Sequence, residues 1–213
     1  MLACTGVFAT YWKWEVEAKK DSIVAIRRLQ AFRQNMVLSI DNVNEGRYWV
    51  YLTSTFTHNR GSHLMLNMVS LLSASWIIVP IFGTSTLAVL WVGAGVVKAV
   101  AQERLWRQET PPLDQWAVGA SGSIFGIYTA LSCVMPCRSV DFFWIPIPMW
   151  SSIAGAAVFS IAAINQGWLP FIGHADHLEG MAFRLIWGLA VLRRRVFRKF
   201  AVAPRTPNIR PRF

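Results

Sequence analysis

Five long apolar segments follow one another along the chain, separated by short polar or proline-bearing breaks. They cover residues 64–82, 86–101 (with Lys98 near its end), 117–135, 142–164 and 175–192. A helix that crosses a bilayer needs about 20 mostly apolar residues, and breaks this short are typical of a compact helix bundle. The pattern predicts membrane-spanning helices within one all-α domain, which we place at residues 62–192.

The chain before this domain has a different pattern. Residues 2–12 are apolar but amount to about half a span, so they predict either an incomplete first membrane helix or an interfacial piece. Four apolar residues then recur at helical spacing among basic residues: Ile23, Ile26, Leu29 and Phe32. That spacing predicts an amphipathic helix, which lies on a membrane surface or packs on the rest of the protein. We therefore assign residues 1–61 to a partial first helix and an interfacial segment.

Composition narrows the class of protein. Of the 213 residues, 54% are hydrophobic and 15% are charged, and there are 11 Trp and 13 Phe. Disorder needs low hydrophobicity and high charge, whereas aromatic rings collect at membrane interfaces. The net charge of +10 would suggest nucleic acid in a soluble protein. Here much of the excess lies in a short tail, residues 193–213, which predicts a side facing the cytoplasm or its equivalent and no nucleic-acid partner.

Polar residues stand out at the starts of three predicted helices. His63 and Asn67 lie four residues apart at the start of the first, so they share one helix face. Ser121 lies in Gly119-Ala120-Ser121-Gly122 at the start of the third, and His177 near the start of the fifth. Successive spans alternate in direction, so all three starts lie on the same side of the membrane. Polar groups at membrane depth are costly and usually functional, which predicts a shared site.

These residue types suit hydrolysis of an amide. A serine hydroxyl becomes a nucleophile when a base removes its proton, and His177 is a candidate base on another helix. The negative charge that builds on the carbonyl oxygen needs fixed donors, which the Ser121 amide, Asn67 and His63 can supply. Each residue taken alone also has a structural interpretation, since small and polar residues in membrane helices often serve packing or interhelical hydrogen bonds.

Three ordered motifs carry a family resemblance. The stretch 47–58 leads to His58, His63 and Asn67, and the stretch 119–126 reads Gly-Ala-Ser-Gly-Ser-Ile-Phe-Gly. The third motif comprises Gly167-Trp168, Phe171 and the stretch 174–180, which reads His-Ala-Asp-His-Leu-Glu-Gly. Together these motifs resemble the rhomboid family of intramembrane serine proteases from about residue 47 to residue 192. The last stretch is most similar to the mitochondrial, presenilin-associated-like branch.

The resemblance implies a rhomboid-like six-helix transmembrane bundle whose first helix is represented by residues 2–12. It implies a dyad of Ser121 as nucleophile and His177 as general base, with His63 and Asn67 helping the Ser121 amide to hold the oxyanion. The residues expected to support this dyad are Gly119, Gly122, Phe125 and Gly180. No metal or cofactor is implied. The expected partners are the lipid bilayer and a membrane-protein substrate, and the expected location is the mitochondrial inner membrane.

The third motif also departs from the family pattern. Rhomboids usually carry small residues around the histidine of this helix, whereas Asp176 precedes His177, Glu179 precedes Gly180, and Arg184 follows one turn later. A guanidinium at membrane depth costs a few kcal/mol. These departures favour a second interpretation, a proteolytically inactive rhomboid-fold subunit that serves structure or assembly in a larger mitochondrial membrane complex.

Overall fold

Helices make up most of the structure, a computed structural model that describes residues 1–108, 115–142, 145–168 and 174–192. In chain order the helices are α1 (Leu2–Ala18), α2 (Ile23–Met36), α3 (Ile40–Asn44), α4 (Val50–Thr53), the 3-10 helix η1 (Ser54–Phe56), α5 (Gly61–Phe82), α6 (Thr84–Trp106), α7 (Ser121–Ser132), α8 (Met149–Gln166), α9 (His174–Trp187) and the π-helical turn η2 (Gly188–Leu192). The strands are β1 (Leu38–Ser39), β2 (Trp116–Ala117), β3 (Ser139–Phe142) and β4 (Ile145–Pro148). The basic tail, residues 193–213, and Phe171 lie outside the described residues.

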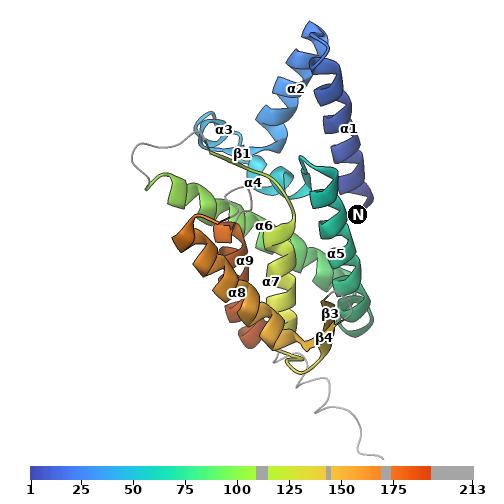
Figure 1. The fold of residues 1–213 in the computed structure, drawn as a ribbon, viewed down its shortest axis with the longest axis vertical. Helices are drawn as coiled ribbons and strands as arrows, with labels where there is room; N and C mark the ends of the chain where they lie inside the picture. Colours follow the sequence, from blue (N-terminus) through green and yellow to red (C-terminus); the bar gives the residue numbers. More distant parts are fainter. Residues whose placement is uncertain (109–114, 143–144, 169–173, 193–213) are drawn as a thin grey trace, which may run out of the picture.

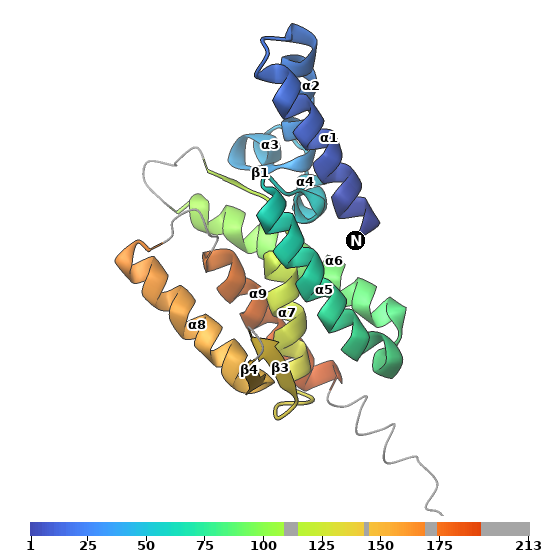
Figure 2. The ribbon, with the colours of Figure 1, turned by 45° about the vertical axis from the view of Figure 1, so that its right-hand side comes forward.

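Helix α7 is the centre of the bundle. It contacts α5, α6, α8 and α9, and Figures 1 and 2 show it flanked by α9 on one side and by α5 and α6 on the other. Its buried side chains Ile124, Ile127 and Leu131 pack in one apolar cluster with residues of α5 and α6. The start of α7, at Ser121, is therefore fixed in place by contacts of this helix with its four neighbours.

The helices match the predicted spans unevenly. Helix α5 ends at Phe82, where the first predicted span ends, and α6 continues to Trp106, beyond the predicted end at residue 101. Among the described residues, α5 and α6 are the helices long and apolar enough to cross a membrane. Helix α7 begins later than predicted, at Ser121, because Trp116 and Ala117 pair with β1 as a strand.

The expected start of the fourth span is wrong, because residues 139–142 and 145–148 form two antiparallel strands rather than helix. Pro146 pairs with Asp141, and Pro148 pairs with Ser139. Proline has no amide hydrogen to donate and cannot sit in a helix interior, but two prolines at alternate positions fit the outward-facing side of an edge strand. Helix α8 therefore begins only after Pro148.

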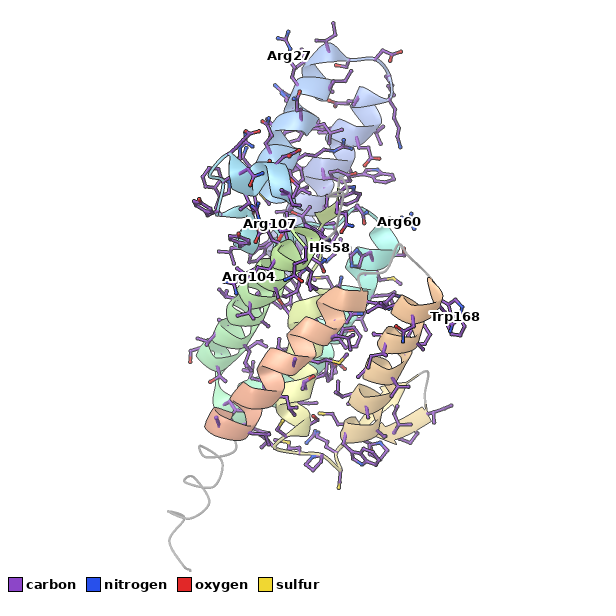
Figure 3. All side chains as sticks on the ribbon, turned by 90° about the vertical axis from the view of Figure 1, so that its left-hand side faces the viewer. Arg27, His58, Arg60, Arg104, Arg107 and Trp168 are labelled. Carbon is purple, nitrogen blue, oxygen red and sulfur yellow. The ribbon has the colours of Figure 1, made fainter. Side chains whose placement is uncertain are left out.

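The N-terminal segment forms a helical hairpin of α1 and α2. Figures 1 and 2 show this hairpin extending away from the bundle, and Figure 3 labels Arg27 near its far end. Leu29 and Phe32 of α2 are buried against Tyr11 of α1, and the Tyr11 and Phe32 rings lie 5.7 Å apart. The predicted amphipathic helix thus packs on α1 through this face, while other apolar residues of α2, at its N-terminal end, stay exposed.

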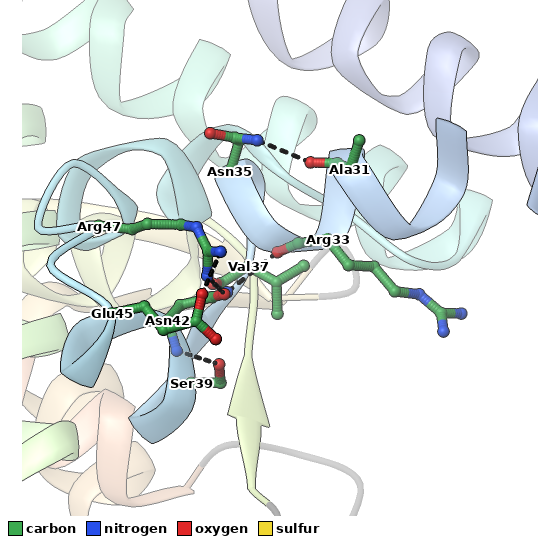
Figure 4. Close-up of polar contacts among 8 residues, drawn as sticks. All are labelled: Ala31, Arg33, Asn35, Val37, Ser39, Asn42, Glu45 and Arg47. Atoms are coloured by element: carbon green, nitrogen blue, oxygen red, sulfur yellow. Dashed lines mark hydrogen bonds and ion pairs between the residues drawn. The ribbon is translucent and has the colours of Figure 1, made fainter. Parts of the chain in front are cut away.

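A buried asparagine organises the chain after α2 (Figure 4). The Asn42 side-chain amide donates to the carbonyls of Arg33 (3.1 Å) and Val37 (2.8 Å). Its side-chain oxygen accepts from the Arg47 guanidinium at 2.9 Å, and its backbone amide is capped by the Ser39 hydroxyl at 3.2 Å. These bonds fix the turn that leads from the hairpin to strand β1, which pairs with β2 just before helix α7.

We expect Asn42→Ala to lower the free energy of unfolding by about 2–3 kcal/mol, because it removes the side-chain hydrogen bonds to two carbonyls and to a guanidinium at a poorly solvated site. Thermal unfolding in detergent measures the loss. The matched control is Asn35→Ala, since exposed Asn35 donates only to Ala31 within its own helix, at 2.8 Å. Equal unfolding midpoints for the two variants would contradict the prediction.

Candidate active site

Ser121 is the first residue of α7 and is half-buried. The preceding Gly119 has a φ of +120°, a conformation that L side chains rarely adopt, and its amide donates to the Ser54 carbonyl at 2.9 Å. This hydrogen bond holds the turn before α7 against the chain at Ser54. The Ser121 amide lies in the first helical turn, where backbone N–H groups have no partner within the helix and the helix dipole is positive.

The His63 ring packs directly on the glycine turn. A Cβ atom built on Gly119 would lie 2.6 Å from His63 Cε1 and 2.9 Å from Nε2. The His63 ring therefore contacts Gly119, which lies two positions before Ser121 in the sequence. Only glycine fits at position 119, because a Cβ atom there would collide with this ring. Asn67 follows one turn later on α5 and is 6% exposed. Within the described residues its Nδ2 atom has no hydrogen-bond partner, so a donor is buried there and available.

His177 reaches the same region from α9. Its ring centroid lies 4.3 Å from that of Phe125, one turn after Ser121, with the planes inclined by 38°. Three residues after His177, Gly180 lies against the backbone carbonyl of Gly122 so closely that a Cβ atom would collide with it. The two contacts bring the first two turns of α7 and the first two turns of α9 against each other.

The sequence-predicted residues thus fall into two direct contacts around Ser121. One joins His63 to Gly119, and the other joins α9 to α7 through the pairs just described. The side chains of Asp176, Glu179 and Arg184 lie outside what the structure describes. These contacts gather a serine, two histidines and an asparagine, residue types that suit acyl transfer, around the start of α7.

The sequence pattern missed a buried lysine. Lys98 of α6 is 1% exposed, and its positive charge is one of the smaller causes that lower the pKa of His58. A lysine near a span end ordinarily extends to the interface. Helix α6 continues for about two more turns after Lys98, so this lysine lies inside the bundle. The sequence pattern ended the span at residue 101 and therefore did not predict this burial.

His58, in the turn before α5, is fully buried, and its ring lies 5.1 Å from that of His63. Figure 3 labels it between the hairpin and the bundle, near Arg60, Arg104 and Arg107. Burial, with smaller contributions from His63 and Lys98, lowers the pKa of His58 to about 4. It is therefore neutral at physiological pH. Its Nδ1–H faces the Phe56 carbonyl at 3.3 Å, which leaves Nε2 as an acceptor.

Comparison with known protein families shows to which family this chain belongs. The rhomboid domain matches residues 45–194, most of the chain and all the helices that build the site. The chain belongs to the rhomboid family, which includes intramembrane serine proteases.

Relatives of this chain are mitochondrial. It is 31% identical over 141 residues to the human presenilin-associated rhomboid-like protein, covering 64% of this chain and 36% of that protein. It is 26% identical over 142 residues to the mitochondrial rhomboid protein 1 of Saccharomyces cerevisiae, covering 63% and 39%. It is 30% identical over 115 residues to an uncharacterized mitochondrial rhomboid protein of Schizosaccharomyces pombe, covering 52% and 29%. The chain therefore spans well under half the length of these relatives.

Proposed function

We propose that this chain is an intramembrane serine endopeptidase with Ser121 as nucleophile and His177 as general base. The observation that carries the proposal is the close contact of α7 and α9, in which the centroids of the His177 and Phe125 rings lie 4.3 Å apart while Gly180 lies on Gly122. A base on a different helix can take a proton from a serine only when the helices approach this closely.

The reaction follows from the groups present. The Ser121 oxygen attacks the scissile carbonyl carbon, and its proton passes to the His177 imidazole. The oxyanion is held by the Ser121 amide, by Asn67 Nδ2 and by the His63 ring, which are fixed donors in a site of low dielectric. His177 then gives its proton to the leaving amine. Water, deprotonated by the same imidazole, hydrolyses the acyl-enzyme and returns the serine.

The proposed setting is a six-helix transmembrane bundle. Helices α5 and α6 have the length and composition of membrane spans, and the outer faces of α5 and α8 expose large apolar side chains, among them Leu66, Trp76, Val158 and Ile161. Exposed apolar surface on this scale marks contact with lipid or protein. The proposed substrates are membrane proteins cut within or near the bilayer. The proposed location is the mitochondrial inner membrane, and the mitochondrial names of the relatives support the organelle.

A second candidate is a rhomboid-fold subunit without protease activity that supports a larger mitochondrial membrane complex. The observation that favours it is the tight contact of α9 with α7, because Glu179 and Arg184 place two charges in the helix that makes this contact. Charged residues at membrane depth need a partner. A partner protein would meet that need.

Labelling with a fluorophosphonate distinguishes the two. We expect the purified chain in detergent to form a covalent adduct, located by mass spectrometry on Ser121, and Ser121→Ala to form none. The matched control is Ser123→Ala, because buried Ser123 donates to the Trp91 carbonyl at 3.0 Å and has no place in the reaction. A folded native chain that never reacts, and that copurifies stoichiometrically with a large complex, would overturn the protease proposal.

A further inference from the structure

His58 is a buried histidine that the proposed reaction does not use. Its side chain is fully buried, and its Nδ1–H donates to the Phe56 carbonyl at 3.3 Å. Burying a polar ring is unfavourable unless its polar atoms are hydrogen-bonded. Because Phe56 lies two residues earlier in the same turn, this hydrogen bond anchors the His58 ring to its own backbone and fixes the direction in which the ring points.

The turn that carries His58 is tied to the turn before α7. The Ser54 carbonyl accepts from the Thr57 amide at 3.2 Å and from the Gly119 amide at 2.9 Å. One carbonyl oxygen therefore joins the two turns. The spacing between the His58 ring and the start of α7 is set by backbone hydrogen bonds, which do not depend on side-chain rotamers.

The His63 ring contacts both of these turns. Its centroid lies 5.1 Å from that of the His58 ring, with the planes inclined by 68°, an edge-to-face arrangement that aromatic rings favour. Its Cε1 atom lies against Gly119, 2.6 Å from where a Cβ would be. His63 belongs to the first turn of α5, and helix ends fray. Contacts from outside the helix are therefore needed to hold this ring in one place.

We propose that His58 is a positioning residue of the active site, whose anchored ring holds the His63 imidazole against Gly119 beside the start of α7. The inference rests on the proposed function, in which His63 donates to the oxyanion. A donor stabilises an oxyanion best when it is already aimed at the position where the charge develops, and a misplacement of about 1 Å can cost about a hundredfold in rate. His58 acts through His63 and not on the substrate.

Two substitutions separate the ring of His58 from its hydrogen bond. Asparagine has an amide N–H at about the position of Nδ1–H, so His58→Asn keeps a donor for the Phe56 carbonyl but removes the ring that meets His63. His58→Phe keeps an aromatic ring and removes the donor. We expect fluorophosphonate labelling of Ser121 in detergent to be about tenfold slower in His58→Asn, less than the loss of about 10²–10³ for a deleted oxyanion donor. His58→Phe should stay within about threefold of the native rate, because the edge-to-face contact is kept.

The matched control is Thr57→Val, in the same turn. Thr57 is buried, and its hydroxyl donates to the Met36 carbonyl at 2.8 Å, so valine removes a buried hydrogen bond without changing a ring. This variant should unfold at a lower temperature and keep the native labelling rate within about twofold. If Thr57→Val slowed labelling as much as His58→Asn, the effect would follow the stability of the turn rather than the ring, and the proposal would be overturned.

A double substitution shows whether His58 acts through His63. In a His63→Ala background, His58→Asn should change the labelling rate by less than about twofold, because the ring that it positions is absent and the two effects are then not additive. A further loss of about tenfold in that background would overturn the proposal, since His58 would then act by another route. This comparison decides the matter also if His58→Phe does not fold, as judged by its thermal unfolding.

A measurement on the His63 ring itself does not depend on protease activity. The chain has four histidines, so labelling them with carbon-13 at Cε1 gives four imidazole signals by NMR, which single substitutions assign. In a Ser121→Ala background, His58→Asn should lower the order parameter of the His63 Cε1–H bond by roughly a third, the difference between rigid and flexible groups, and Thr57→Val should leave it unchanged. An unchanged order parameter in folded His58→Asn would overturn the proposal. If the native chain never labels with the fluorophosphonate, the proposed function fails, while this comparison still decides the role of His58.

Discussion

Substituting alanine for Gly180 should lower the free energy of unfolding by about 3 kcal/mol and slow the fluorophosphonate labelling of Ser121. The new methyl group would collide with the Gly122 carbonyl, and backbone atoms cannot move aside as a flexible side chain can. Inserting a carbon into a packed contact costs about 1–3 kcal/mol or more. Here α9 must move away from α7, and the contact of the His177 ring with the Phe125 ring must loosen with it. Thermal unfolding in detergent and the labelling rate measure the two effects.

The matched control is Gly155→Ala on α8. A Cβ atom at Gly155 meets nothing within 4 Å, and alanine is the better helix former by up to about 1 kcal/mol. That variant should unfold at or slightly above the native midpoint and label at the native rate. If Gly180→Ala behaved in the same way, α7 and α9 would not approach as closely as the structure has them, and the pairing of Ser121 with His177 would lose its basis.

The sequence pattern predicts the helices of the bundle but not where each of them begins. The first predicted span and α5 end together at Phe82, because Gly83 takes a positive φ of 83° and ends the helix. Of the apolar run that begins at Phe142, Phe142 and residues 145–148 lie in strands, and an apolar run of this length does not by itself distinguish strand from helix. Long-range pairing decides it, since Val140 lies opposite Ile147 across the hairpin.

The candidate site divides in a similar way. Small residues such as Gly119 and Gly180 are recognisable because a motif surrounds them, and the structure gives each a steric reason, a ring or a carbonyl that leaves no room for a Cβ. The enclosure of Lys98 was not predictable, since it depends on where α6 ends. It also depends on contacts with α9, whose residues lie about 80 positions further along the chain. The assignment of Ser121 and His177 as a reacting pair remains a prediction.

The test with the second large effect concerns the base. His177→Ala should lower the rate of fluorophosphonate labelling by about a thousandfold, because a positioned general base contributes about 10²–10⁴ and no other imidazole lies against the Phe125 ring among the described residues. The thermal midpoint should fall only modestly, since the residue is half-buried. Measuring labelling rate and unfolding in the same detergent separates loss of the base from loss of the fold.

His174→Ala is the matched control for that variant. His174 lies one turn earlier on α9, is buried, and has its ring 6.2 Å from that of His177 and 5.7 Å from that of Phe159. It shares the residue type, the helix and the neighbourhood of His177, but it stacks on α8 rather than on α7. Its replacement should therefore cost less than about tenfold in rate, the size of a lost positioning contact rather than of a lost base. If the two variants lost rate equally, the assignment of His177 rather than His174 as the base would lose its support. If His177→Ala kept most of the native rate, His177 would be excluded as the base.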